Sequence, residues 1–186
     1  MNLINEIING KNKFSLAITG GGTRAISYLL ENGGASSVFL GALVPYSNSM
    51  LKTYTYTKYE KAVSIDAARA MLDWSRYGNT ENHYSISSTS SLAKNGIERE
   101  GRQHSVVLAS QYTFYSEQPI IFEAPALEVN LNEKRTRLEE EELVAKLIIA
   151  YTHFSLGLSV QPPHLNSTIW YEYVGMTEQD EVCAYK

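Results

Sequence analysis

The chain has 186 residues, which favours a single domain, and 44% of them are hydrophobic, enough for an ordinary packed core. A net charge of −4 argues against a basic nucleic-acid surface, and no apolar run approaches the ~20 residues that a membrane-spanning helix needs. The one cysteine, Cys183, has no partner for a disulfide, and no cysteine or histidine spacing is typical of zinc. We expect a cytoplasmic protein without cofactor or metal, whose partners include neither nucleic acid nor membrane.

The first two-thirds of the chain alternates between helical and strand-like patterns. Apolar residues at helical spacing predict helices over 3–8, 24–32 and 64–78, and the polar stretch 46–53 is predicted to begin a short helix. Short apolar or alternating runs predict strands, which cover 13–19, 37–44, 84–88, 104–112 and 119–129. Residues 54–61 fit a helix or a strand, and 89–103 are predicted to form a polar loop. The alternation favours a layered α/β domain in which 119–129 adds an antiparallel strand.

A long helix is predicted after Thr136. Thr136 and Glu139 have the spacing of a capping box, in which each side chain bonds to the other residue's backbone N–H group. The buried stripe that follows reaches Phe154. We interpret the acidic run 139–142 as a solvated helix start that complements the helix dipole.

Pro162 and Pro163 mark a boundary in the chain. We therefore divide the sequence into one domain over residues 1–160 and a C-terminal tail over 161–186. The centre of the tail, 169–174, is predicted to be a strand.

A glycine-rich run, TGGGTR, links a predicted strand to a predicted helix. A helix start exposes unpaired N–H groups and a partial positive charge, and glycines let the backbone approach a ligand closely. Together with two threonine hydroxyls and an arginine, this is a candidate phosphate or carboxylate site. The candidate binding residues of the run are Gly20, Gly21, Gly22, Thr23 and Arg24. The spacing is neither GxGxxG nor that of a P-loop, and a tight connection without a ligand also explains the glycines.

Two further stretches follow strands at the same predicted edge of the sheet. In open α/β sheets ligands lie at the carboxyl ends of strands, so VPYSNS supplies the candidates Tyr46, Ser47 and Asn48. The alternative is that a polar side chain here simply caps the next helix. A serine-rich run followed by basic residues supplies the further anion-binding candidates Ser88, Thr89 and Arg102, with a solvated loop as the alternative.

These stretches together resemble the CinA C-terminal family, whose known activity is nicotinamide-nucleotide amidase. The resemblance is carried by AITGGGT at 17–23, GASSVFLG at 34–41 and VPYSN at 44–48, and covers most of residues 5–157. It implies an α/β fold, a three-layer α/β/α sandwich with a mixed, mostly parallel sheet. It also implies hydrolysis of the carboxamide of nicotinamide mononucleotide to nicotinate mononucleotide and ammonia.

The sequence departs from the family at the catalytic positions. The family's first motif reads AESCTGG, with the serine as nucleophile, and its second reads YSNxxK, with the lysine as activating base. Here Thr19 replaces the serine and Leu51 replaces the lysine, with Lys52 one residue along. A hydroxyl needs a base to take its proton, and on a helix Lys52 would point about 100° away from the position of Leu51. The resemblance therefore implies that the amidase pair is broken and that the binding half of the site survives.

Three functions remain open. The first is a domain that binds a phosphorylated small molecule, such as nicotinamide mononucleotide, with weak or absent amidase activity. The second is an active amide (C–N) hydrolase with a rebuilt site, in which Thr19 is the nucleophile, the glycine amides stabilise the oxyanion, and the base is Lys52, Lys94 or His104. The third is a homo-oligomeric interaction module that uses the aromatic-rich segments 54–59 and 169–174.

Overall fold

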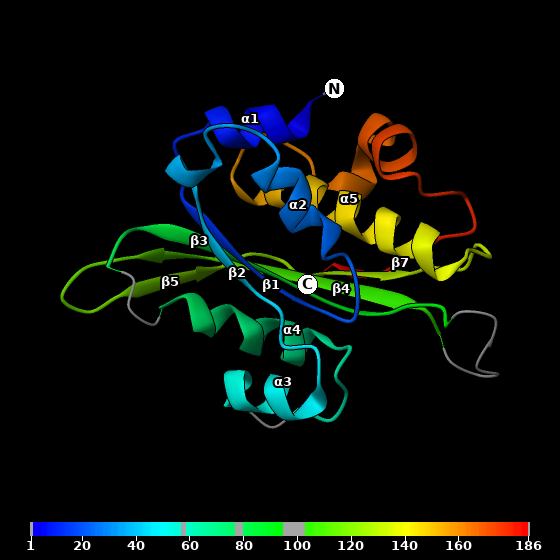
Figure 1. Ribbon diagram of the computed structural model, residues 1–186, viewed down its shortest axis with the longest axis horizontal. Coiled ribbons are helices and arrows are strands. Elements are labelled where there is room, and N and C mark those ends of the chain that lie inside the picture. Colours follow the sequence, from blue (N-terminus) through cyan, green and yellow to red (C-terminus); the bar gives the residue numbers. More distant parts are fainter. Residues whose placement is uncertain (1, 57–58, 77–79, 95–102, 186) are drawn as a thin grey trace.

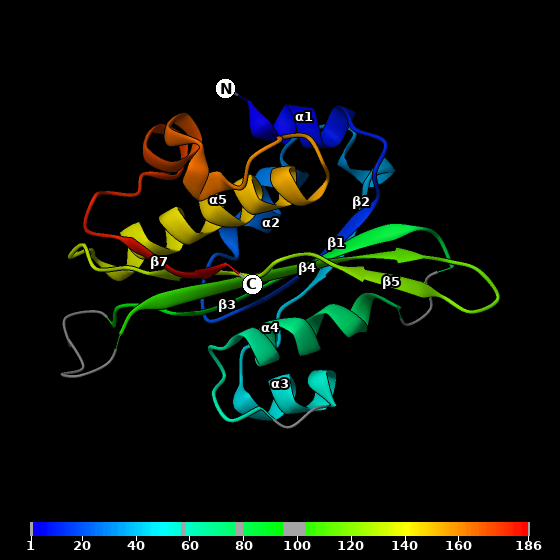
Figure 2. The ribbon, with the colours of Figure 1, turned by 180° about the vertical axis from the view of Figure 1, so that it is seen from behind.

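The computed structural model describes residues 2–56, 59–76, 80–94 and 103–185. Helices pack on both faces of one seven-stranded sheet (Figures 1 and 2). One face is covered by α1 (Leu3–Asn9), α2 (Arg24–Leu30), α5 (Arg137–Ser155) and the π-helix η4 (Thr168–Val174). The other face is covered by α3 (Asn48–Thr55) and α4 (Ile65–Met71). The predicted three-layer α/β/α sandwich is confirmed.

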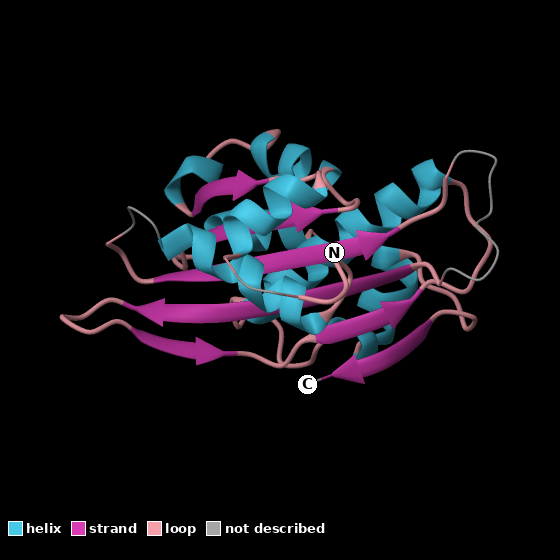
Figure 3. Ribbon diagram, turned by 90° about the horizontal axis from the view of Figure 1, so that it is seen from below, coloured by secondary structure: helices cyan, strands magenta, loops and turns pink. Residues whose placement is uncertain are grey.

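The sheet is mixed, as predicted. Its strands are β1 (Phe14–Thr19), β2 (Phe39–Leu43), β3 (His83–Ser91), β4 (Ser105–Phe114), β5 (Ile120–Glu123), β6 (Leu127–Asn130) and β7 (Glu181–Tyr185). They run in the order β2-β1-β3-β4-β6-β7, and β5 pairs with the other half of the outer edge of β4 (Figure 3).

The balance of parallel and antiparallel pairs corrects one expectation. β1 pairs in parallel with β2 and β3, but every described pairing beyond β3 is antiparallel, so the sheet is not mostly parallel. Parallel neighbours need a crossover connection, and helices α2, α3 and α4 form the crossovers among β1, β2 and β3. Beyond β3, the successive strands β5 and β6 run back along β4, and after α5 and η4 the chain returns antiparallel to β6.

The predicted caps fix the helix starts. Thr136 and Glu139 form the capping box of α5, and Ser64 caps α4 by accepting the Ala67 N–H at 3.1 Å. Within the ambiguous segment 54–61, α3 continues to Thr55 and residues 57–58 lie outside the described residues. Short 3₁₀ turns complete the connections at Ala35–Ser37, Leu72–Arg76 and Pro163–Leu165.

Strand β3 is longer than predicted because its hydroxyl side chains bond to neighbouring backbone. It extends to Ser91, into a segment expected to be a polar loop. The Ser87 hydroxyl donates to the Ala68 carbonyl at 2.6 Å, and the Thr89 hydroxyl donates to the Ala62 carbonyl at 2.5 Å. Hydroxyl groups that find such partners can be buried at little cost, so a serine-rich run lies at the centre of the sheet.

The C-terminal segment also differs from the prediction. Residues 168–174 form a π-helix instead of a strand, and its residues Ile169, Trp170 and Val174 pack into the main core. In a strand the side chains of Ile169 and Trp170 would point to opposite faces of the sheet. In the helix both side chains pack against the core on the side of α5. The run 119–129 is interrupted at Pro125 and forms two strands, and β7 was not predicted. The segment beyond Pro162 is therefore packed on the sheet and α5, and the proposed boundary at 160 remains a prediction.

Candidate functional site

The glycine turn lies between β1 and α2, and close packing requires its glycines. Gly20 and Gly22 have φ angles of +89° and +86°, in the left-handed region that glycine adopts freely. A Cβ on Gly20 would lie 1.8 Å from the Ser90 carbonyl oxygen, and one on Gly21 would lie 2.2 Å from the Leu92 side chain. The strand-to-helix connection thus explains the glycines without a ligand.

The turn nevertheless binds an anion, and that anion is the Glu141 carboxylate of α5. One oxygen accepts the Gly22 N–H at 2.8 Å, and the other accepts the Thr23 N–H at 2.8 Å and the Thr23 hydroxyl at 2.9 Å. Unpaired amides at a helix start favour such a carboxylate. The anion predicted at this position is therefore supplied by the chain itself, and an incoming phosphate would have to displace Glu141 from these donors.

Arg24 is paired in the same region. Its guanidinium lies 3.1 Å from Glu142, which also accepts one hydrogen bond from the Tyr28 hydroxyl. The hydrogen bond to Glu142 raises the pKa of Arg24. Burial alone would raise the pKa of Glu142, but the hydrogen bonds from Tyr28 and Arg24 outweigh it and lower that pKa. Burial and the bond to Glu142 raise the pKa of Tyr28 to about 12.

Thr19 and Lys52, the predicted catalytic residues, have different surroundings. Thr19 is 5% exposed, and its hydroxyl donates to the Pro45 carbonyl at 2.9 Å. Leu51 is buried against Ala17 and Met71, while Lys52, the next residue on α3, is exposed. Successive helical residues diverge by about 100°, so the lysine faces solvent as the sequence predicts.

The second predicted stretch lies beside the glycine turn, because the Thr19–Pro45 hydrogen bond joins the ends of β1 and β2. Ser47 caps α3 by accepting the Met50 N–H at 3.2 Å, which is the capping role considered as the alternative. Tyr46 is 69% exposed, and Asn48 is also exposed. These two side chains are accessible to a ligand at the strand ends.

The third predicted stretch is divided by the structure. Ser88 lies inside β3, is 0% exposed, and its hydroxyl has no hydrogen-bond partner among the described residues. Thr89 is buried and bonded to Ala62, so neither side chain lies on an accessible loop. Arg102 lies outside the described residues.

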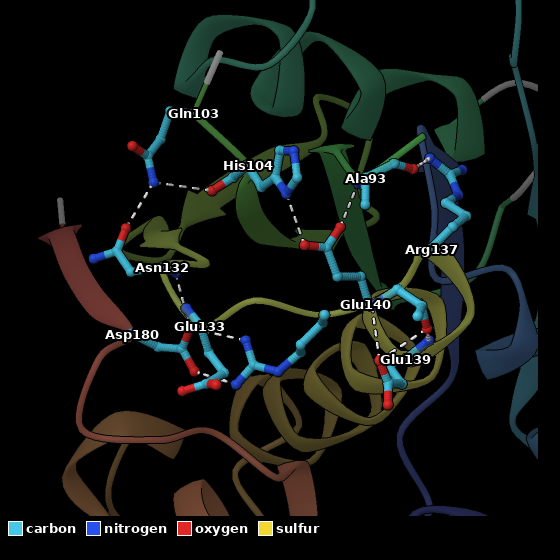
Figure 4. A network of polar contacts seen from close by, with 11 residues as sticks. Ala93, Gln103, His104, Asn132, Glu133, Arg137, Glu139, Glu140 and Asp180 are labelled. Atoms are coloured by element: carbon cyan, nitrogen blue, oxygen red, sulfur yellow. Dashed lines mark hydrogen bonds and ion pairs between the residues drawn. The ribbon is translucent and has the colours of Figure 1, made fainter. Parts of the chain in front are cut away.

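A histidine–carboxylate pair was not predicted as a site. His104 Nδ1 lies 2.8 Å from Glu140, whose side chain is 0% exposed and whose other oxygen accepts the Ala93 N–H (Figure 4). The His104 side chain is 24% exposed. A buried carboxylate that holds an imidazole through Nδ1 fixes its orientation, which is the geometry of a general base and its orienting group.

The interpretation of the acidic run 139–142 as a solvated helix start is confirmed for Glu139, which is exposed, and wrong for Glu140, which is fully buried, while Glu141 and Glu142 are partly buried. Glu139 closes the capping box, Glu140 holds His104 and Ala93, Glu141 binds the glycine turn, and Glu142 binds Arg24. Four adjacent carboxylates point in different directions around the helix, so each meets a different segment. Four consecutive acidic residues at a helix start were the feature of the sequence that could have indicated these contacts.

Arg137 strengthens the same junction. Its guanidinium donates to the Ala93 carbonyl at 3.5 Å (Figure 4). It also donates to the Gly20 carbonyl at 2.6 Å, so it joins the glycine turn to the end of β3. The first turn of α5 thus fixes the relative positions of the glycine turn and His104.

A cavity of about 670 Å³ opens at the start of α5, beside α2 and the segment after η4. Its lining includes Arg24, Lys134 and Arg135, together with Glu139 and Glu142. Arg24 is already paired with Glu142, and Arg135 with Asp180. The mixed charges of this cavity favour neither an anion nor a cation.

Two other kinds of site are not found in the part of the chain that the structure describes. No group of three or more histidine, cysteine or acidic side chains is arranged to hold a metal ion there. None of the described helices combines the length and apolar character required to cross a bilayer.

Comparison with known proteins identifies the fold. No protein-family model and no curated protein matches the chain. Among solved structures, a CinA superfamily protein from Klebsiella pneumoniae superposes with a TM-score of 0.61 at 12% identity, over 85% of this chain and 95% of the other. The competence/damage-inducible protein CihA from Agrobacterium tumefaciens gives 0.56 at 19% identity, over 84% and 91%. A CinA superfamily protein from Escherichia coli gives 0.52 at 15%, over 84% and 86%. The chain therefore has the CinA fold, and at the level of fold the resemblance is confirmed.

Proposed function

We propose that this protein is a CinA-like binding domain for a phosphorylated small molecule, with weak or absent amide hydrolysis. The first candidate ligand is a pyridine mononucleotide such as nicotinamide mononucleotide. The observation that carries the proposal is the state of the catalytic positions. The Thr19 hydroxyl donates a hydrogen bond to the Pro45 carbonyl, and Lys52 is exposed on α3, so among the described residues the partner of that hydroxyl is a backbone carbonyl and not a base that could take its proton.

The binding part of the proposal rests on the strand ends. Tyr46 and Asn48 are exposed where β1 and β2 end, which is where open α/β sheets bind ligands. Beside them the glycine turn holds a carboxylate through two amides and a hydroxyl. We expect the ligand's phosphate to compete with Glu141 for these donors, while the ring lies over Tyr46.

A proton NMR titration and time course with nicotinamide mononucleotide tests this function. We expect selective broadening of the ligand's resonances and no signals from nicotinate mononucleotide. Glu141→Gln removes the competing charge, so it should tighten binding. Glu178→Gln is the matched control, because Glu178 is exposed and the change removes the same charge elsewhere. Unchanged ligand spectra at millimolar concentration with both variants would rule out this ligand.

The His104–Glu140 pair favours a second candidate function. In a rebuilt hydrolase, His104 would act as the base, held by the buried Glu140 carboxylate. Appearance of nicotinate mononucleotide in the same time course would support it. Activity should then be lost in His104→Gln, and also in Thr19→Val if Thr19 is the nucleophile. A rate unchanged in both variants would exclude this mechanism.

A further inference from the structure

Strand β5 forms an open and apolar edge of the sheet. On its inner side it pairs with β4, and on its outer side no described strand pairs with it (Figure 3). Ile120, Ile121 and Phe122 are 50%, 37% and 57% exposed, and Phe114, the partner of Ile120 on β4, is 43% exposed. An exposed edge offers unpaired N–H and C=O groups, and this one also offers four neighbouring apolar side chains.

An aromatic row crosses the sheet and ends at this edge. Directly paired positions on five neighbouring strands carry Phe39, Phe14, Tyr84, Tyr112 and Phe122. Ring centroids lie 5.2 Å apart for Phe39 and Phe14, 4.7 Å for Tyr84 and Tyr112, and 6.3 Å for Tyr112 and Phe122. Cross-strand aromatic pairs stabilise a sheet, and the last member of this row has no neighbour on its outer side among the described strands.

We infer that a second copy of this chain binds here, through antiparallel pairing of β5 with β5 about a two-fold axis at Ile121. In this register Ile121 lies opposite its own counterpart, and Ile120 lies opposite Phe122 of the other copy. Each aromatic row then continues from Phe122 into Ile120 and Phe114 of the second copy. Side chains alternate between the two faces of a strand, so Ile120 and Phe122 meet their counterparts on one face of the joined sheet, and Ile121 meets its own counterpart on the other. The contact is the same on both copies, as an isologous interface requires.

Two other two-fold registers lie next to this one. An axis at Ile120 would place Phe122 opposite the polar Gln118 and Ile121 opposite Pro119, so it forms fewer apolar pairs. Charge decides against the other register. A two-fold axis at Phe122 would place Glu123 opposite Ile121 and would bury a carboxylate against an apolar side chain. An axis at Ile121 places Glu123 opposite Pro119, outside the apolar centre. Glu123 also has an ion pair with Arg69 at 3.7 Å, and both side chains lie at the surface. The acidic and basic groups therefore form a polar rim around an apolar seam.

The area of this edge predicts a weak association. A stable interface of standard size buries about 800 Å² on each partner. Two half-exposed phenylalanines and two isoleucines offer less, and backbone hydrogen bonds from a four-residue strand add modestly. Pro119 and Pro125 flank the strand and prevent further pairing, which fits a closed dimer and not an open fibre. We expect a dissociation constant in the micromolar range or above.

Disulfide trapping tests the register directly. In a Cys183→Ser background, Ile121→Cys places two thiols opposite each other, at a separation that suits a disulfide. Mild oxidation should give a covalent dimer on a non-reducing gel. Ile120→Cys is the matched control, because its counterpart lies diagonally across the seam and it should cross-link at least several-fold more slowly. Equal rates for the two variants would overturn the register.

Sedimentation velocity over a concentration series tests the surface itself. Ile121→Lys puts two like charges opposite each other and should weaken the association by at least ~10-fold. Leu40→Lys adds the same charge on β2, at the opposite edge, where Leu40 is 42% exposed, and should leave the association unchanged. A wild-type protein that stays monomeric at hundreds of micromolar, or a dimer lost in Leu40→Lys and kept in Ile121→Lys, would overturn the proposal.

Discussion

Two carboxylates on this molecule bind backbone amides in different ways. The side chain of Asp180 is completely buried and accepts the N–H group of Asn132 at 3.0 Å (Figure 4). It also holds Arg135 through both oxygens at 2.9 and 2.6 Å and accepts the N–H group of Thr177 at 3.0 Å. Glu141 is only partly buried and binds the glycine turn through two amides and one hydroxyl, with no guanidinium among those donors. Asp180 is therefore a fixed structural clasp, whereas an external anion could replace Glu141.

The largest effect is expected at Asp180. Asp180→Asn leaves the Arg135 side chain, 9% exposed, without its carboxylate partner, so the free energy of unfolding should fall by about 3–5 kcal/mol. Urea unfolding followed by circular dichroism measures this. Glu178→Gln, an exposed acid two residues earlier, should change the stability by less than about 0.5 kcal/mol. If the two variants lost equal free energies of unfolding, the buried contacts of Asp180 would not be what stabilises the fold here.

The same clasp predicts a pH dependence. Burial alone would raise the pKa of Asp180, but hydrogen bonds from Arg135 and from the Thr177 amide outweigh it and lower that pKa. A lowered pKa in the folded state adds stability that is present above the unfolded pKa of about 3.9 and is lost as the pH falls through the folded pKa. Urea unfolding between pH 6 and pH 2 should therefore converge for the wild type and Asp180→Asn at the acid end. A constant difference would contradict this assignment.

Glu141→Gln should have an intermediate effect. The variant loses charge-assisted hydrogen bonds to Gly22 and Thr23, which should reduce stability by about 1–3 kcal/mol. Unlike Asp180→Asn, it should be rescued by an external anion. Thermal unfolding with and without millimolar phosphate measures the rescue, with equal ionic strength maintained by chloride. If phosphate stabilises the wild type as much as the variant, Glu141 and the anion do not compete.

The smallest effect is expected at Tyr28, beside the glycine turn. Tyr28→Phe removes one hydrogen bond to Glu142 and should reduce stability by about 0.5–1.5 kcal/mol. The pKa of Tyr28 is raised to about 12, so its contribution is complete below the ordinary value of about 10 and is lost as the pH rises toward 12. Absorbance titration of the phenolate in wild type and variant measures this. The phenolate that the variant lacks should be one that the wild type forms near pH 12. If the two titration curves instead differ near pH 10, the raised pKa of Tyr28 is contradicted.

Much of the fold followed from local patterns. The capping box at Thr136 and Glu139, and the caps at Ser47 and Ser64, depend on residues three positions apart, and their backbone geometry is largely independent of the rest of the chain. The extension of β3 and the helical form of residues 168–174 were missed because they depend on partners far away in the sequence. A serine-rich strand needs the Ala62 and Ala68 carbonyls, and η4 needs the surface of α5.

Only those parts of the candidate site that depend on residues close together in the sequence could be predicted. The glycine turn and the outward position of Lys52 beside the buried Leu51 are local features, and the strand ends bring Thr19 and Pro45 together as the topology requires. The occupant of the turn could not be found in this way, because Glu141 is 118 residues from Thr23. The pairing of His104 with Glu140 likewise depends on how α5 packs against the sheet.

The start of α5 has a consequence for how the molecule opens. The amides of Gly22 and Thr23 donate to Glu141, and the Ala93 amide donates to Glu140, so both segments are attached to neighbouring residues of one helix. If the helix frays from its start through Glu141, all three amides lose their acceptors in the same event. Hydrogen exchange at Gly22, Thr23 and Ala93 should then report a single opening free energy, below that of the central strands. The glycine turn and the region around His104 would become accessible together.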